Sequence, residues 1–362
     1  MWKALEEKIH PFRHHLLTIS FVGGFIIDNF TLVRVDLLID DILISSYVVI
    51  SMLGMIFMYL GASDKYSPRF KEIADKWAAP VIQFAFGGVM SGMLVFYSRS
   101  GSWYTSWPYL LVLLSIIYGN ERITKKAQRL VFNLSVFFVG LFSYLALLVP
   151  VVIGKMGDVV FVSCGVLALI IIALFIRVLS LIVPNFIALN TRSILFSIGM
   201  IYVVINGLYF ANLIPPVPLS IKEIGVYHHV EKLDNDTYKL SFEQGKWYEF
   251  WKESDNIFNY TEGESVYCYA AVYVPERLAT TIYHRWEYYD TKLGKWVFHA
   301  RIPYPIAGGR LDGYRGSTYI DSVRDGKWRC SVENARGQTI GRAVFTVVTG
   351  HTPASTVTRV DL

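Results

Sequence analysis

The first 214 residues consist of long apolar runs, whereas the residues after them alternate between apolar and polar positions. Apolar runs of roughly 20 residues, enough to cross a hydrocarbon core of about 30 Å, recur between short charged segments. We expect three prolines, Pro215, Pro216 and Pro218, to stop the last helix, because proline lacks the amide donor that a helix requires. The pattern predicts seven transmembrane helices, at residues 15–33, 42–61, 80–97, 104–119, 130–150, 158–183 and 193–214.

Beyond residue 225 the apolar residues recur with the period of two that is typical of strands. Seven or eight strands are expected, near residues 226–233, 247–251, 265–274, 281–289, 296–302, 314–321, 327–333 and 339–348. The fold expected is a membrane all-α bundle followed by an all-β immunoglobulin-like sandwich. The expected domains are a transmembrane helical domain at 1–214, a proline-rich linker at 215–225, the β-sandwich at 226–349 and a flexible tail at 350–362.

Composition and charge set the environment of both parts. A chain that is 53% hydrophobic, with a mean hydropathy of +0.40, is too apolar for an ordinary soluble protein. Cytoplasmic loops carry the excess of Lys and Arg, so an inside amino terminus and an outside β domain are predicted. With that orientation, the cytoplasmic segments hold Lys3, Lys8, Arg13, Lys65, Arg69, Lys71, Lys76, Arg122, Lys125, Lys126, Arg129 and Arg192, and the outer segments of the helical domain hold Arg34, Arg99 and Lys155.

Two cysteines and a tryptophan share the inward parity of their expected strands. Cys268 and Cys330 lie on apolar faces, and Trp286 lies on a third such face between them in sequence. This order resembles the signature of immunoglobulin-like sandwiches, in which the tryptophan packs on an inter-sheet disulfide. Trp328 stands where a tyrosine is usual in those domains. The pattern predicts a Cys268–Cys330 disulfide, with two buried free thiols as the alternative.

Five stretches carry a resemblance to a known family. They are Gly23–Asp36, Gln83–Ser100, Ile214–Val230, His284–Tyr289 and Gly326–Val347. They resemble bacterial polytopic inner-membrane proteins that end in the domain of unknown function 2914. The resemblance implies an inner-membrane protein with a periplasmic β domain, and it supplies no reaction.

An ionisable residue inside a span is costly and hints at function. Asp28 is such a residue, and Arg34, Asp36 and Arg99 are close enough in the predicted topology to form a membrane polar cluster at the outer leaflet. A lipid head group or another anionic substrate would suit this cluster. The alternative is a structural ion pair or a hydrogen-bond network between helices.

Metal and catalytic sites are not expected. Asp36, Asp40 and Asp41 could serve a lipid-linked sugar transferase as a metal-binding or general-base site, but their loop is very short. His228 and His229 are adjacent on a strand and so point to opposite faces. No Cys or His pair has metal-ligand spacing, and no phosphate loop or nucleophile elbow occurs. We therefore expect no metal and no cofactor.

The glycine-rich run 306–319 is the expected binding segment of the outer domain. Arg310, Tyr314, Arg315 and Tyr319 offer guanidinium groups and rings suited to sugars or anions, and the alternative is an ordinary connection between strands. A second hypothesis gathers four arginines into one patch for phosphate or carboxylate groups of envelope polymers, namely Arg310, Arg315, Arg329 and Arg342.

These observations predict a non-enzymatic inner-membrane protein. Its periplasmic domain is expected to bind a protein partner or an envelope glycan, with the bundle in the lipid bilayer as anchor and lipid-binding scaffold. No nucleic-acid partner is expected. The alternative is a membrane enzyme or transporter that acts on a lipid-linked or anionic substrate through the polar cluster.

Overall fold

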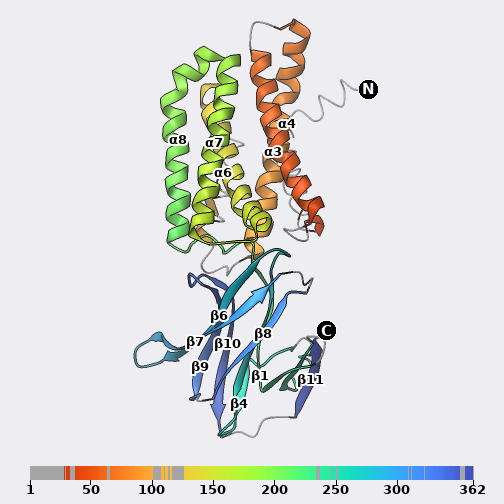
Figure 1. Cartoon of the computed structure of the whole chain (residues 1–362), viewed down its shortest axis with the longest axis vertical. Helices are drawn as coiled ribbons and strands as arrows, with labels where there is room; N and C mark the ends of the chain where they lie inside the picture. Colours follow the sequence, from red (N-terminus) through yellow and green to blue (C-terminus); the bar gives the residue numbers. More distant parts are fainter. Residues whose placement is uncertain are drawn as a thin grey trace. The chain divides into compact units, whose positions relative to one another are not determined.

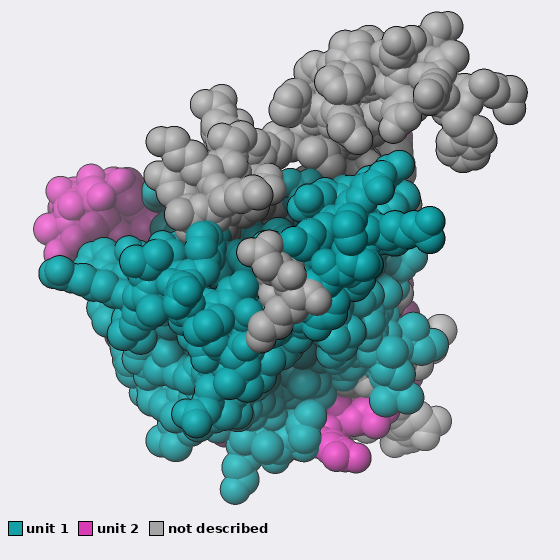
Figure 2. Space-filling view, turned by 90° about the horizontal axis from the view of Figure 1, so that it is seen from above, with its two compact units in different colours: residues 1–98, 106–214 teal, residues 99–105, 215–362 magenta. Residues whose placement is uncertain are grey.

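The computed structural model describes residues 28, 30–32, 37–62, 66–100, 107–109, 111–112, 115, 126–233, 237–245, 247–249, 252–308, 310, 312–321, 323–350 and 355–361. The chain divides into two compact units, coloured separately in Figure 2. One comprises residues 1–98 and 106–214, and the other comprises residues 99–105 and 215–362. Each unit is described below by itself.

Five helices of the first unit are long and apolar enough to cross a membrane (Figure 1). They are α3 (Leu38–Ala62), α4 (Pro68–Arg99), α6 (Lys126–Ile153), α7 (Asp158–Ile182) and α8 (Pro184–Phe210). They correspond to five of the seven expected spans. The expected spans 15–33 and 104–119 lie mostly outside the described residues, so the total of seven stays a prediction.

Small residues allow close helix contacts in this unit. A side chain on Gly88 of α4 would meet the ring of Tyr47 of α3, with the nearest atom at 2.5 Å from the added carbon. Gly165 of α7 lies in the same way between the rings of Phe142 and Tyr202. Glycine is therefore required at both positions, as expected for helices that pack through small residues.

The last helix ends earlier than predicted. Asn212 adopts a positive φ of 59°, its amide donates to the carbonyl of Tyr209, and the amide of Leu213 donates to that of Leu208. This is the Schellman arrangement, and asparagine tolerates the left-handed conformation that it needs. Helix α8 thus ends at Phe210 because Asn212 forms this C-terminal cap. The prolines lie beyond the cap and do not terminate the helix.

The second unit contains three β-sheets (Figure 1). The sheet β1–β5–β8 is antiparallel, with strands Ser220–Tyr227, Val266–Tyr273 and Tyr314–Ile320. The sheet β4–β10–β9–β6–β7 has strands Ile257–Tyr260, Thr339–Thr349, Gly326–Asn334, Ala279–Asp290 and Lys295–Ala307, and its β4 runs parallel to β10. The sheet β11–β3–β2 has strands Thr356–Asp361, Tyr238–Glu243 and His229–Lys232.

The main core lies between the first two of these sheets. Cys268 of β5 is bonded to Cys330 of β9, which confirms the predicted disulfide. Trp286 of β6 is directly opposite Cys330 in register and fully buried, and its indole donates to the hydroxyl of Thr318. The disulfide therefore joins the two sheets inside the core, with the tryptophan beside it.

A second core covers the other face of the sheet β1–β5–β8. Tyr227 and Tyr269 point away from the disulfide and pack against Tyr238, Leu240 and Phe242 of β3. The unit is therefore built in three layers, because the sheet β1–β5–β8 has apolar residues on both faces.

The boundaries of the β unit differ from those predicted. Strand β1 begins at Ser220, within the expected linker 215–225, and β11 occupies Thr356–Asp361 of the expected flexible tail. The sequence pattern does not predict short strands such as β4, because four residues are too few to show a clear alternation. The described part of the expected strand 247–251 is a turn, and Trp247 is 93% exposed.

Candidate anion-binding site

Alternation within β6 and β9 divides their side chains between the core and the outer face of the five-stranded sheet. His284 and Trp286 of β6 are fully buried in the core, so Arg285 between them projects to the outer face. The same parity places Arg329 and Glu333 of β9 on the outer face, opposite to Cys330. This face is polar.

The register aligns three arginines in one row across four strands. Arg285 of β6 pairs with Arg301 of β7 on one side and with Ser331 of β9 on the other, and Ser331 pairs with Arg342 of β10. Like charges directly opposite each other destabilise a sheet. The row therefore requires carboxylates close by.

Two buried glutamates partly compensate this charge. Arg285 contacts Glu287 at 3.0 Å and Glu333 at 3.7 Å. Arg329 contacts Glu287 at 2.6 Å, and Arg301 contacts Glu333 at 3.4 Å. Three arginines therefore share two carboxylates, and with Arg342 included the net charge of the group is four minus two, or +2.

Arg342 is the arginine without a carboxylate partner. Its Nε donates to the hydroxyl of Ser331 at 3.0 Å, and within the described ranges no Asp or Glu oxygen lies within 4.0 Å of its guanidinium. Burial lowers the pKa of Arg342, and the charge of Arg329 lowers it further. A guanidinium remains protonated in proteins nonetheless, so a half-buried positive charge is left without a counterion.

Burial and the neighbouring charges affect the two glutamates differently. Burial raises the pKa of Glu287, but Arg329 and Arg285 outweigh it and hold that pKa below its ordinary value. Burial also raises the pKa of Glu333, and the charges of Arg285 and Arg301 do not fully offset this effect. Glu287 is therefore the firmer counterion of the pair.

Aromatic rings hold the guanidinium groups in position. The ring of Trp296 lies 4.4 Å from the guanidinium carbon of Arg329, and the ring of Tyr283 lies 3.7 Å from that of Arg301. Phe298, which is 56% exposed, lies beside Arg285. Oriented guanidinium groups next to rings are suited to carboxylate or phosphate groups carried on a sugar.

The residues expected at the glycine-rich run are only partly brought together. Arg310 lies 5.6 Å from the ring of Tyr314. Arg315 lies on the opposite face of β8 from Tyr314, and its Nε is paired with Asp361 of β11 at 2.9 Å. Tyr319 is 54% exposed and its ring packs on Tyr267, so the four residues do not form a single surface.

The predicted four-arginine patch divides in the same way. Arg329 and Arg342 lie together on the outer face of the five-stranded sheet, whereas Arg315 lies on another sheet and is bound to Asp361. The arginines that accompany Arg329 and Arg342 on this face are Arg285 and Arg301, and not the predicted Arg310 and Arg315. Alternation along β6 is enough to place Arg285 on the outer face, but only strand pairing shows that Arg301 and Arg342 share its row.

The membrane polar cluster is described in part. Asp28 is buried, and its carboxylate accepts a hydrogen bond from the hydroxyl of Ser91 of α4. Arg34 and Asp36 lie outside the described residues. Arg99 follows Ser91 by eight positions, which is about 12 Å along a helix.

Two acidic residues of the hypothetical transferase site lie at the start of α3. Asp40 and Asp41 occupy the first turn of that helix, where the positive end of the helix dipole stabilises carboxylates. Asp40 is 4% exposed. The third member of the hypothetical transferase site, Asp36, is outside the described residues.

These features define a class of protein with apolar helices that are long enough to cross a membrane and a β-rich carboxy-terminal unit. Residues 279–347, from β6 to β10, match the family described as "Protein of unknown function (DUF2914)". The match confirms the resemblance drawn from the sequence motifs. It includes the six residues that we call the arginine face, namely Arg285, Arg301, Arg329, Arg342, Glu287 and Glu333. No curated protein matches the chain.

Two solved structures have weak similarity to this chain. A β-glucosidase from Listeria innocua in complex with glucose has a TM-score of 0.20 and 10% identity over 33% of this chain, which spans 16% of its length. The alkylpurine DNA glycosylase AlkC from Pseudomonas fluorescens, bound to DNA containing an abasic site analog, has a TM-score of 0.20 and 10% identity, with 81% of this chain and 77% of that one covered. Scores this low carry no argument about fold or function.

Proposed function

We propose that this protein is an inner-membrane protein whose β unit lies in the periplasm and binds an anionic envelope glycan on its arginine face. The helices serve as the anchor. The observation that carries the proposal is the half-buried guanidinium of Arg342, which has no carboxylate partner among the described residues. Arg342 lies in the same row as Arg285 and Arg301, so the positive charge is concentrated there. An anionic group on the ligand would supply the missing counterion.

The arrangement of the sheets supports an immunoglobulin-like β unit. The order β1–β5–β8 corresponds to strands A, B and E of that fold, and β10–β9–β6–β7 corresponds to G, F, C and the added strand of variable-type domains. The disulfide from β5 to β9 would then be the bond between strands B and F. Sandwich domains of this kind commonly present a sheet face or end loops to a ligand.

Binding can be tested with isolated peptidoglycan sacculi as the probe. The full chain in detergent is expected to cosediment with sacculi, and Arg342→Gln is expected to reduce that binding at least tenfold. Arg310→Gln is the matched control, because Arg310 lies on the loop after β7 and outside the row. Equal binding by wild type and Arg342→Gln would refute the assignment of the site, and loss with Arg310→Gln would move it to the glycine-rich run.

Location in the periplasm has its own test. A phosphatase reporter joined after Leu362 is expected to be active, since the excess of Lys and Arg in the opposite loops predicts an outer carboxy-terminal unit. Activity of a cytoplasmic reporter at the same position would reverse the orientation.

Asp28 favours a second candidate function, that of a membrane enzyme or transporter. Its carboxylate is buried in the helical unit and bonded to Ser91, an arrangement that suits a substrate or ion pathway. Under this hypothesis Asp28→Asn gives cells the same phenotype as loss of the whole protein, while Arg342→Gln gives the wild-type phenotype. Under the binding proposal the two effects are reversed.

A further inference from the structure

Three large apolar residues are exposed on the five-stranded sheet that carries the arginine face. They are Phe298 of β7, Val344 of β10 and Ile257 of β4, which are 56%, 50% and 59% exposed. Single exposed apolar residues are common on protein surfaces. These three are informative because of where they lie relative to the arginines.

Strand alternation places Val344 and Ile257 on the outer face of the sheet. Val344 follows Arg342 by two positions on β10, so both side chains point to the same side. Ile257 precedes Phe258, which is fully buried in the main core, and therefore points away from that core.

Phe298 and Val344 occupy the two ends of one row across the sheet. Phe298 of β7 pairs with Glu287 of β6. Glu287 pairs in turn with Arg329 of β9, which pairs with Val344 of β10. Three spacings of about 4.8 Å between neighbouring strands put the two apolar residues roughly 14 Å apart. The ion pair of Glu287 and Arg329 lies between them.

Ile257 extends this pattern to the edge strand β4. Thr346 of β10 pairs with Ile257 on one side and with Lys327 of β9 on the other. Lys327 is exposed and precedes the buried Trp328, so it adds positive charge to the outer face. The outer face therefore has a basic centre with apolar residues towards both of its edges.

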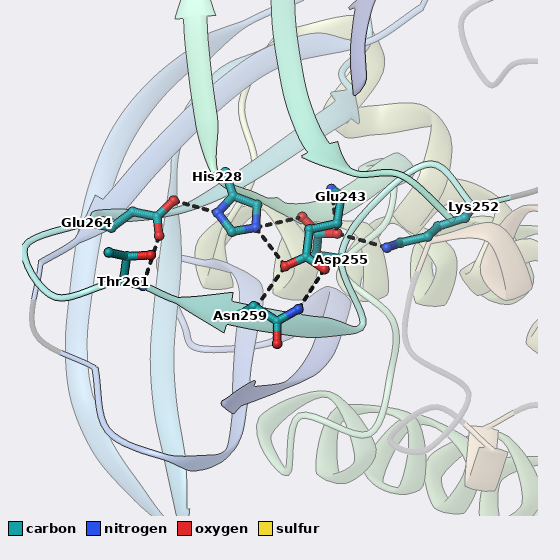
Figure 3. A network of polar contacts seen from close by, with 7 residues as sticks. All are labelled: His228, Glu243, Lys252, Asp255, Asn259, Thr261 and Glu264. Carbon is teal, nitrogen blue, oxygen red and sulfur yellow. Dashed lines mark hydrogen bonds and ion pairs between the residues drawn. The ribbon is translucent and has the colours of Figure 1, made fainter. Parts of the chain in front are cut away.

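A cluster of carboxylates lies next to β4 and limits this face (Figure 3). It comprises Glu243, Asp255 and Glu264 around His228, with Lys252 paired to Asp255. Glu243 accepts hydrogen bonds from both the backbone amide and the side-chain amide of Asn259 of β4. Three carboxylates exceed the one lysine, so an anionic ligand is attracted to the centre of the sheet and repelled beyond β4.

The charge of the face selects among possible occupants. In a symmetric pair of chains the same surface meets itself, so the net charge of +2 on the arginine face would oppose an equal charge. A chain of sugars with carboxylates supplies the opposite charge, and the C–H groups on the faces of its rings can pack on apolar side chains. Nε of Arg342 donates to Ser331, so a carboxylate would be bound through the two terminal nitrogens of that guanidinium.

We propose that the arginine face binds a segment of a linear, carboxylate-bearing glycan that crosses the sheet from β7 to β4. This inference rests on the proposed function and specifies its ligand as several consecutive sugars. A single sugar ring is much shorter than the roughly 14 Å between Phe298 and Val344, so it cannot contact both. The inner sugars place their carboxylates at Arg285 and Arg342, and the outer sugars pack on the apolar residues at the two ends.

The test uses the full chain in detergent and fluorescently labelled oligosaccharides in which every second sugar carries a carboxylate. Fluorescence anisotropy measures the affinity for the disaccharide, tetrasaccharide, hexasaccharide and octasaccharide. We expect affinity to rise at least tenfold from the disaccharide to the hexasaccharide. It should change less than twofold from there to the octasaccharide, because the carboxylates next to β4 end the path.

Variants at the ends of the row separate this arrangement from binding by charge alone. Phe298→Ala is expected to weaken hexasaccharide binding about tenfold and to leave disaccharide binding within about twofold. Val344→Thr, which keeps the shape of the side chain, should weaken hexasaccharide binding about threefold. Leu293→Ala in the turn after β6 and Val357→Thr on β11 are the matched controls, since both residues are exposed and lie outside the row. Urea unfolding checks that each variant keeps the wild-type fold.

Several results would overturn this inference and leave the proposed function standing. They are equal affinity for all four lengths, or hexasaccharide binding that neither Phe298→Ala nor Val344→Thr weakens, while sacculi still bind through Arg342. Tighter binding of a poly(glycerol phosphate) chain of equal charge would assign the face to a phosphate polymer, and dimers that Phe298→Ala dissociates would assign it to a second copy. A wild type that binds neither sacculi nor any oligosaccharide would refute the proposed function itself.

Discussion

Arg285 and Arg301 occupy directly opposed positions on β6 and β7, and both guanidinium groups reach the carboxylate of Glu333. Two like charges in this register repel each other unless an anion lies between them. Glu333 supplies that anion on one side of the row and Glu287 on the other. The face is therefore held together by its own carboxylates and still retains excess positive charge for an external anion.

Removal of the shared carboxylate should have opposite effects on stability and on binding. Glu333→Gln leaves two arginines without their counterion, and we expect a loss of roughly 1–3 kcal/mol in unfolding free energy, since both guanidinium groups remain partly exposed. Affinity for anionic sacculi should increase, because the net charge of the face increases. Urea unfolding and cosedimentation measure the two quantities.

The control for this variant is Glu262→Gln, at an exposed position of the β unit. Its unfolding free energy should stay within about 0.5 kcal/mol of wild type. A Glu333→Gln protein as stable as this control would mean that Glu333 does not hold the row together.

The disulfide should contribute a large part of the stability of the β unit. It closes a separation of 62 residues, for which the chain-entropy model gives about 4 kcal/mol. We expect the double variant Cys268→Ala, Cys330→Ala to unfold at a lower urea concentration than wild type. Reductant should shift the wild-type transition in the same direction and leave the double variant unchanged. A reductant effect on the double variant would show that another group is responsible.

Stability should fall below pH 6.5 because of His284. Burial lowers the pKa of His284 to about 3, whereas an unfolded histidine has a pKa of about 6.5. The unfolded state therefore binds the proton first, so stability is complete above pH 6.5 and is lost progressively toward pH 3. At pH 5 the loss is about 2 kcal/mol.

A glutamine at this position tests the origin of that pH dependence. His284 contacts the hydroxyls of Thr318 and Tyr304, and Gln can bond to hydroxyls without taking up a proton. His284→Gln should show a smaller fall between pH 8 and pH 5 than wild type in urea unfolding, while the exposed His229→Gln should retain the wild-type fall. If all three proteins change equally, His284 is not the titrating group.

The carboxy-terminal strand should be needed for stability. Asp361 of β11 accepts bonds from Arg315 and from the hydroxyl of Tyr269, and Arg359 pairs with Glu223 of β1. Deletion of residues 356–362 removes the carboxylate of Asp361 that Arg315 and Tyr269 contact, and we expect a loss of roughly 2–4 kcal/mol in unfolding free energy. Limited proteolysis provides a second measurement, since a paired β11 resists cleavage in the intact chain. Unchanged unfolding after deletion would restore the interpretation of this segment as a loose tail.

Much of the core and of the architecture follows from local patterns. Long apolar runs can be satisfied only as helices in lipid, so the five described spans could be predicted from length and hydropathy alone. The period of two in β5, β6 and β9 placed Cys268, Trp286 and Cys330 inside. The disulfide follows from that parity, because inward cysteines of facing sheets can meet.

The candidate sites could not be predicted in the same way, because they depend on which strands pair and in which register. Alternation with the buried His284 and Trp286 places Arg285 on the outer face, but nothing local to it indicates that Arg301 and Arg342 lie in the same row. His228 meets Asp255 because a loop returns the chain after β3. Such contacts are set by the packing of distant segments.

By itself the sequence determined the two classes of environment along the chain, lipid for the first part and a half-buried sheet for the second, since side-chain hydropathy and its period act locally. Only the tertiary structure decided which charges share a surface. Three arginines share two carboxylates beside a fourth arginine on one sheet, and one histidine meets three carboxylates from separate segments, because electrostatic interactions depend on distance in space and not on separation along the chain.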